Sequence, residues 1–94
     1  MTIEIKKRKK ETVIRVTGVL DDVTAPALEK AISDIAKNTT IIILDLNGID
    51  EISGEGLLAL LKARKEMKEK GSLRLTGVCE SVMQVIETTG GHLY

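Results

Sequence analysis

The sequence predicts an α/β fold, a single domain with a mixed, mostly parallel four-stranded sheet and three helices. Its 94 residues are enough for one domain, spanning 1–94. Apolar residues make up 43% of the chain, as in globular proteins, and nearly all are aliphatic because Tyr94 is the only aromatic residue. Segments with the two-residue period of a strand alternate with segments of helical period, in the order β-β-α-β-α-β-α. Strands that alternate with helices form parallel neighbours through right-handed crossovers.

The first two strands are predicted to form a hairpin. Thr2 to Lys7 alternates apolar and polar residues, and Thr12 to Thr17 resumes the apolar pattern until Gly18. Lys7 to Glu11 is a charged connection short enough to join antiparallel neighbours. The first strand therefore lies antiparallel at an edge of the sheet, where its lysines discourage pairing with other chains.

The first helix is predicted to begin near Pro26, with Thr24 as its N-cap. Asn38 is predicted to end it. Apolar residues at three- and four-residue spacing form one face of this helix, namely Ala27, Leu28, Ala31, Ile32 and Ile35.

The second half of the chain continues the alternation. Ile41 to Leu44 is a β-branched and aliphatic run typical of a strand buried on both faces, and 45–53 is expected to be a loop with a turn at Gly48. A helix that is apolar early and charged late runs from Leu57 to Lys70.

Gly71 ends that helix, and a fourth strand is predicted over Ser72 to Thr76. A third helix is predicted over Ser81 to Thr88. The dipeptide Gly90-Gly91 closes it.

Composition excludes several classes of function. Fourteen basic and fourteen acidic residues cancel, so no overall field steers the protein onto DNA or an anionic membrane, and no Phe or Trp is present to stack on bases. No apolar run approaches the length of a membrane span, and no signal peptide is apparent, so we expect a cytoplasmic protein without membrane insertion. Cys79 and His92 are the only residues of their types, too few for a disulfide or a metal site.

The stretch from Leu44 to Leu58 predicts the position of the functional site. A buried strand passes into a helix whose first turn holds Gly54 and Gly56 around Glu55. In open α/β sheets, binding sites collect at the carboxyl ends of strands, where helix N-termini present free N–H groups. Small residues there let a partner approach the backbone closely.

Three motifs in order resemble the STAS domain of bacterial anti-sigma-factor antagonists, and the resemblance covers nearly the whole chain. Gly18 to Asp21, followed by Thr24 to Pro26, is similar to the family's G-x-L-D…T-A-P. Leu44 to Ile49 is similar to L-D-L-S-x-V, and Val82 to Gly90 to V-x-x-V-L-x-x-T-G. The resemblance implies a regulatory module for partner-switching in transcription, with no catalytic residue and no cofactor. It implies an anti-sigma factor or related kinase-like protein as partner.

The chain departs from this family at the phosphoacceptor. The family signature is D-S-S-G-L, and its second Ser accepts a phosphate from the partner kinase. Aligning Gly56-Leu57 with G-L places Ser53 at the Asp, Gly54 at the first Ser and Glu55 at the phosphoacceptor. Glu55 is then an ordinary first-turn acid behind an N-cap at Ser53, or a fixed imitation of phosphoserine. The two interpretations are compatible, because a carboxylate that stabilises its helix is still a fixed charge. In a third interpretation, the domain is still switched by phosphorylation, and Ser53 accepts the phosphate.

The resemblance places partner docking on the loops around this junction and on the exposed face of the second helix. Asp21 and Asp22 could equally be solvated acids that favour a helix N-terminus, and Asp45 is expected to cap or brace the loop. The predicted partner-binding residues are Asp21, Asp22, Ser53, Gly54, Glu55, Gly56 and Leu57.

Two alternative functions stay open. One is a STAS subunit of a stress-signalling scaffold or of a transporter-associated complex. The other is a small Mg²⁺-dependent phosphotransfer enzyme, although the chain lacks a Gly-rich phosphate loop. Its candidate ligands are Asp21, Asp45, Asp50, Glu51 and Glu55.

Chains of the family usually continue past Tyr94, so an uncovered apolar edge that favours a homodimer is also expected.

Overall fold

The computed structural model describes residues 1–77 and residue 80. Six elements follow one another in the predicted order. They are β1 (Thr2–Lys7), β2 (Glu11–Leu20), α1 (Ala25–Ala36), β3 (Ile41–Ile52), α2 (Gly54–Lys70) and β4 (Ser72–Thr76). The third predicted helix, over 81–88, lies outside the described residues.

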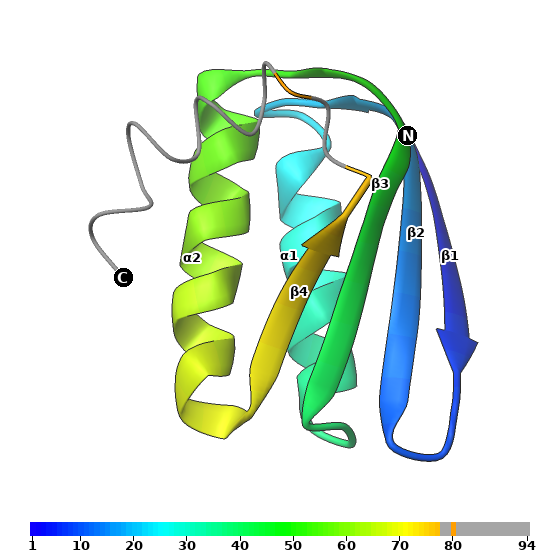
Figure 1. The fold of residues 1–94 in the computed structure, drawn as a ribbon. Helices are drawn as coiled ribbons and strands as arrows, with labels where there is room; N and C mark the ends of the chain where they lie inside the picture. The colour runs from blue at the N-terminus through cyan, green and yellow to red at the C-terminus, as the bar shows by residue number, and fades with distance from the viewer. Residues whose placement is uncertain (78–79, 81–94) are drawn as a thin grey trace.

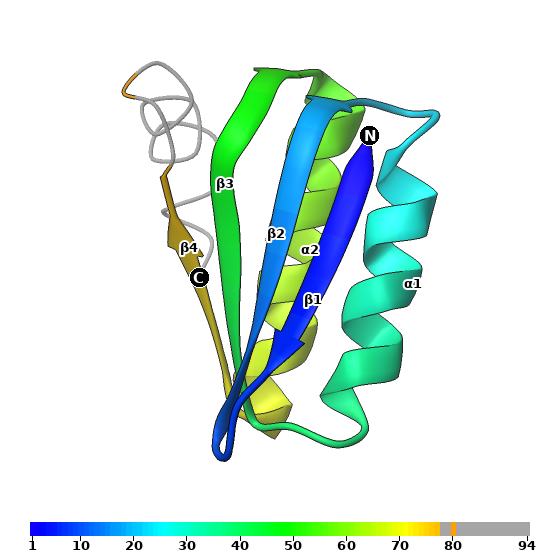
Figure 2. The ribbon, with the colours of Figure 1, turned by 90° about the vertical axis from the view of Figure 1, so that its right-hand side faces the viewer.

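The sheet has the strand order β1-β2-β3-β4 (Figure 1). Strand β1 is antiparallel to β2 at one edge, whereas β2, β3 and β4 are parallel to one another. Both α1 and α2 lie on the same face of the sheet (Figures 1 and 2). The predicted mixed, mostly parallel sheet is therefore confirmed, with two helices described instead of three.

The core lies between this face and the two helices. Alternate residues of β2 and β3, such as Ile14 and Leu44, are fully buried, while their neighbours on the other face are partly or largely exposed. Leu28 from α1 and Leu60 from α2, each 1% exposed, complete the core. In the described part of the chain, no helix is both long and apolar enough to cross a bilayer.

Strand β3 is longer than the sequence predicts. Residues 45–52, expected to form a loop, continue the pairing with β2 as far as Leu20 and Ile52. Gly48 is not a turn residue: it lies opposite Thr17, whose side chain a Cβ at position 48 would overlap. Two register shifts interrupt the pairing of β2 with β3 here, between Arg15 and Thr17 and between Gly18 and Val19. The extension leaves only Ser53 between the end of β3 and the first residue of α2.

The helix ends are set by local chemistry. Pro26 lies in the first turn of α1, as predicted, but the hydroxyl of Thr24 makes no capping bond to that helix. Gly71 follows α2, and its amide donates to the carbonyl of Met67 (2.7 Å). A side chain at position 71 would collide with the backbone of Thr40, so a glycine is needed for this close approach.

Candidate functional site

The junctions that lead into the two helices meet at the carboxyl end of the parallel strands. The amide of Ser53 donates a hydrogen bond to the carbonyl of Leu20 (2.9 Å), which joins the β3–α2 junction to the end of β2. Gly56, one turn into α2, packs against the same Leu20 carbonyl. The predicted site residues on the two segments are therefore brought to one end of the domain.

Ser53 is the N-cap of α2, as predicted. Its hydroxyl oxygen accepts a hydrogen bond from the amide of Gly56 (3.2 Å), and its carbonyl accepts one from the amide of Leu57 (2.9 Å). The amide of Gly56 has no carbonyl partner within the helix, so the Ser53 hydroxyl satisfies it, whereas the bond from the Leu57 amide is the first backbone bond of the helix. Ser53 is half-buried, and its hydroxyl is engaged in capping the helix.

Glu55 lies in the first turn of α2 and its side chain is exposed. Among the residues that the structure describes, it takes part in no salt bridge. A carboxylate at this position is stabilised by the positive end of the helix dipole, by about 0.3–1 kcal/mol. The helix thus presents a negative charge to the surroundings instead of using it inside the domain.

Leu58 stands one turn after Glu55 on the same side of α2 and is 65% exposed. Val23, in the β2–α1 connection, is 78% exposed. Neither residue was predicted to belong to the site. Val23 could have been suspected because it is the one large apolar residue in a polar connection; the exposure of Leu58 depends on which face of α2 packs inward.

Asp21 is used within its own turn. Its Oδ1 accepts hydrogen bonds from the amides of Val23 (3.0 Å) and Thr24 (3.0 Å). The hydroxyl of Thr24 accepts a bond from the amide of Asp21 (2.9 Å) and donates to the carbonyl of Val19 (2.8 Å). The bond from the Thr24 amide is the main cause that lowers the pKa of Asp21. Asp21 therefore shapes the β2–α1 connection, while Asp22 is exposed beside it.

Leu57 and Gly56, two of the predicted partner-binding residues, are buried. Leu57 is 8% exposed and packs with Leu61 against Ile52 and Leu75. Any contribution of Leu57 to docking is through the position of α2, because its side chain points into the domain.

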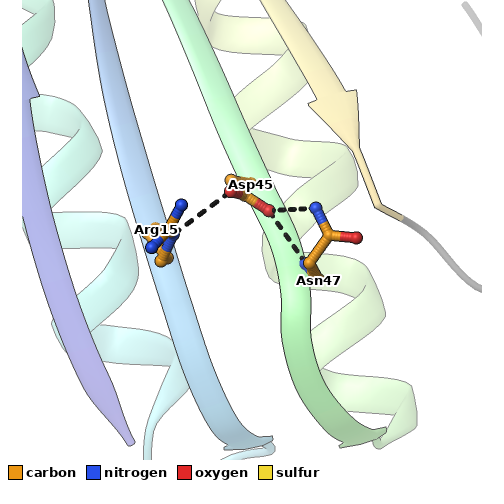
Figure 3. Close-up of polar contacts among 3 residues, drawn as sticks. All are labelled: Arg15, Asp45 and Asn47. Atoms are coloured by element: carbon orange, nitrogen blue, oxygen red, sulfur yellow. Dashed lines mark hydrogen bonds and ion pairs between the residues drawn. The ribbon is translucent and has the colours of Figure 1, made fainter.

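Asp45 braces two strands on the sheet face away from the helices (Figure 3). Its Oδ1 accepts bonds from the amide of Asn47 (3.0 Å) and from Asn47 Nδ2 (2.7 Å), and its Oδ2 accepts one from Arg15 Nε (3.3 Å). The bond from the Asn47 amide is the main cause that lowers the pKa of Asp45. The predicted bracing role is observed, within β3 instead of in a loop.

The five acids considered as Mg²⁺ ligands are not gathered at one point. Asp45 is committed to Arg15 and Asn47 within the sheet, and Glu55 belongs to α2. Within residues 1–77 and residue 80, no group of three or more His, Cys, Asp and Glu side chains is placed to hold a metal ion.

The fold and this helix junction define a class of small α/β domains to which anti-sigma factor antagonists belong. An anti-sigma factor antagonist from Mycobacterium paratuberculosis superposes with a TM-score of 0.83 at 25% identity, over 98% of this chain and 80% of that one. The unphosphorylated antagonist SpoIIAA superposes with a TM-score of 0.77 at 19% identity, over 92% of this chain and 82% of that one. The phosphorylated form of SpoIIAA, from Bacillus, superposes with a TM-score of 0.78 at 16% identity, over 99% of this chain and 87% of that one.

The chain belongs to the STAS domain family, whose sequence profile matches residues 2–92. This match confirms the resemblance found in the sequence. A similar domain also occurs within a larger protein, Mglu, which superposes with a TM-score of 0.74 at 15% identity over 82% of this chain. The chain spans only 19% of the length of Mglu. A comparison with curated proteins by sequence gives no match.

Proposed function

We propose that this STAS domain is a regulatory module of the anti-sigma factor antagonist type, which binds an anti-sigma factor or a related kinase-like protein. Docking uses the exposed residues at the carboxyl end of the sheet, here called the docking surface. It consists of Asp22, Val23, Gly54, Glu55 and Leu58. The hydrogen bond between Ser53 and Leu20 holds the two halves of this surface together.

The observation that carries the proposal is the exposure of Glu55 in the first turn of α2. The alignment of the family signature puts Glu55 where related domains carry the phosphoacceptor serine. SpoIIAA has been solved in unphosphorylated and phosphorylated forms, so a change of charge is part of the chemistry of that relative. A glutamate supplies about one negative charge, against about 1.5–2 for phosphoserine.

Glu55 is therefore proposed to act as a permanent substitute for phosphate. A carboxylate engaged within the domain could not meet a partner, and this one is exposed. Apolar contact area lies beside it, because Leu58, one turn further along α2, is 65% exposed. Val23, 78% exposed, adds apolar surface on the β2–α1 connection. An apolar patch next to a fixed charge suits a protein partner, since apolar contacts provide affinity and the charge provides specificity.

Ser53 is the weaker candidate for a regulatory charge. Its oxygen already accepts the Gly56 amide, and the residue is half-buried. A kinase would have to displace this cap before reaching the hydroxyl. We therefore place the charge at Glu55 and keep Ser53 for the structure of the helix.

Calorimetric titration against the purified anti-sigma factor of the source organism tests the proposal. Glu55→Gln removes the charge with little change of shape. The matched control is Glu69→Gln, which removes an exposed charge from the last turn of the same helix, at the opposite end of the domain.

We expect Glu55→Gln to change the dissociation constant by about fivefold or more, because charges at an interface contribute on the order of 1–3 kcal/mol. Glu69→Gln should bind as the wild type does. Weaker binding of Glu55→Gln would assign the permanent charge to the bound state, and tighter binding to the released state. Equal binding by the wild type and both variants would refute the proposal.

A further inference from the structure

Charges are separated between the two ends of the domain, although their total is zero. Residues 17–28 and 46–61, at the carboxyl ends of β2 and β3, contain five acids and no Lys or Arg. Among the described residues, the N-terminal amine of Met1 adds one positive charge near this end, beside Gly18. The opposite end carries the run Lys6-Lys7-Arg8-Lys9-Lys10. A neutral total therefore conceals an acidic end with the docking surface and a basic end remote from it.

The basic end is built from two connections that lie next to each other. The turn between β1 and β2 and the connection between α1 and β3 line a shallow hollow of about 490 Å³. Lys9, Lys10 and Lys37 provide its positive charges. Polar groups of Asn38, Thr39 and Thr40 line the same hollow and can donate hydrogen bonds to an anion.

Folding does not account for all of these charges. Arg8 pairs with Glu11, which is partly buried, and Lys37 pairs with Asp34 between exposed side chains, each at 3.9 Å. Ion pairs at this distance near the surface contribute little. Lysines along an edge strand protect the edge, which explains residues within β1 but not the turn that follows it. Lys9 and Lys10 are exposed in that turn and form no salt bridge within the described part of the chain.

We infer that this basic end binds the phosphate groups of an anionic lipid surface. Lysine is a flexible, strongly hydrated point charge, which suits attraction to a diffuse anionic surface. Single-stranded nucleic acid is the less favoured partner, because Tyr94 is the only aromatic residue of the chain and no ring platform is available for bases.

The separation of charge also sets the orientation. An anionic surface attracts the turn that holds Lys9 and Lys10 and repels the acidic end that holds Glu55. The domain would then lie with its docking surface directed away from the lipid, free to meet a protein partner. The basic end does not require that the docking surface function as proposed, so the two can fail separately.

Vesicle sedimentation tests the inference with the wild-type protein and two charge-reversed double variants. The vesicles are phosphatidylcholine alone or an equal mixture with phosphatidylglycerol, at about 50 mM and about 0.5 M salt. The test variant is Lys9→Glu with Lys10→Glu. The control, Lys30→Glu with Lys62→Glu, makes the same change of net charge at exposed positions on the two helices.

The wild type should bind the anionic vesicles at low salt, release them at high salt and show no binding to vesicles of phosphatidylcholine alone. The Lys9/Lys10 variant should bind about tenfold or more weakly, whereas the control should stay close to the wild type. A neutral variant, Lys9→Gln with Lys10→Gln, should lose less affinity for the anionic vesicles than the charge-reversed variant does. Circular dichroism checks that each variant is folded. Equal losses in test and control variants, no wild-type binding at low salt, or tighter binding to double-stranded DNA at the same phosphate concentration would each overturn the inference.

Discussion

Gly56 packs so closely against the backbone carbonyl of Leu20 that a methyl group on its α-carbon would overlap the carbonyl oxygen. The same carbonyl accepts the amide of Ser53 (2.9 Å). The start of α2 is therefore held against the end of β2 by one hydrogen bond and by the lack of a side chain. This contact gives the docking surface its shape.

Replacing Gly56 with Ala should destabilise the domain by about 1–3 kcal/mol, because the added methyl forces α2 away from the Leu20 carbonyl. Gly54→Ala is the matched control, since nothing lies within 4 Å of a Cβ at position 54. That variant should be neutral or up to about 1 kcal/mol more stable, because alanine restricts the unfolded chain. Urea unfolding measures both, and equal stability of the two variants would contradict the close packing.

Ser53→Ala should lower the free energy of unfolding by about 0.5–2 kcal/mol, because the Gly56 amide loses its capping acceptor. Ser33→Ala, at an exposed position within α1, should leave stability within about 0.5 kcal/mol of the wild type. Thermal unfolding followed by circular dichroism compares the two. A Ser53→Ala variant as stable as Ser33→Ala would show that the cap contributes nothing.

Leu58→Ala should separate binding from stability. At 65% exposure its side chain adds little to the core, so we expect a change in stability within about 0.5 kcal/mol and weaker binding to the anti-sigma factor. Leu60→Ala, at 1% exposure, should cost about 2–5 kcal/mol through the cavity that it leaves. Unfolding and titration on the same samples check both, and an unchanged affinity for folded Leu58→Ala would remove Leu58 from the docking surface.

Asp45 should make the free energy of unfolding depend on pH in the acid range. Its pKa is lowered in the folded protein, chiefly by the hydrogen bond from the Asn47 amide. The stabilisation is complete above the ordinary pKa of Asp, about 3.9, and is lost as the pH falls through the lower folded value. Asp45→Asn should therefore cost about 1 kcal/mol at neutral pH, and this difference should shrink below about pH 4.

The control for this acid dependence is Asp34→Asn, whose ion pair with Lys37 spans 3.9 Å between exposed side chains. It should change stability by about 0.5 kcal/mol or less over the same pH range. Urea unfolding at a series of pH values compares both variants with the wild type. A difference between wild type and Asp45→Asn that stays constant into acid would contradict the lowered pKa.

The order of the elements could be predicted from sequence because apolar periodicity is a local property. The ends of β2 and β3 could not. Gly18 predicted the end of one strand and Gly48 a turn in the next connection, yet both lie within paired strands. Pairing across the sheet, with two register shifts, overrides the local preference of these residues. Such pairing depends on residues that are about thirty positions apart.

The site could be predicted in part. The capping role of Ser53 follows from its position before a helix, and the structure shows it. Thr24 has the same chemistry, but its hydroxyl bonds to Asp21 and to the Val19 carbonyl because the turn before α1 folds back on β2. The exposure of Leu58 depends on how α2 is rotated against the sheet, since leucines at 57, 58, 60 and 61 cover more than one side of the helix.

Intact-mass spectrometry after incubation with the purified anti-sigma kinase and ATP tests the central claim most directly. The claim is that Glu55 supplies a permanent charge where related domains receive a phosphate. The account predicts that the wild type gains no mass and that Glu55→Ser, with a hydroxyl restored at this position, gains one phosphate. A phosphate on the wild-type protein, at Ser53 or elsewhere on the docking surface, would contradict it.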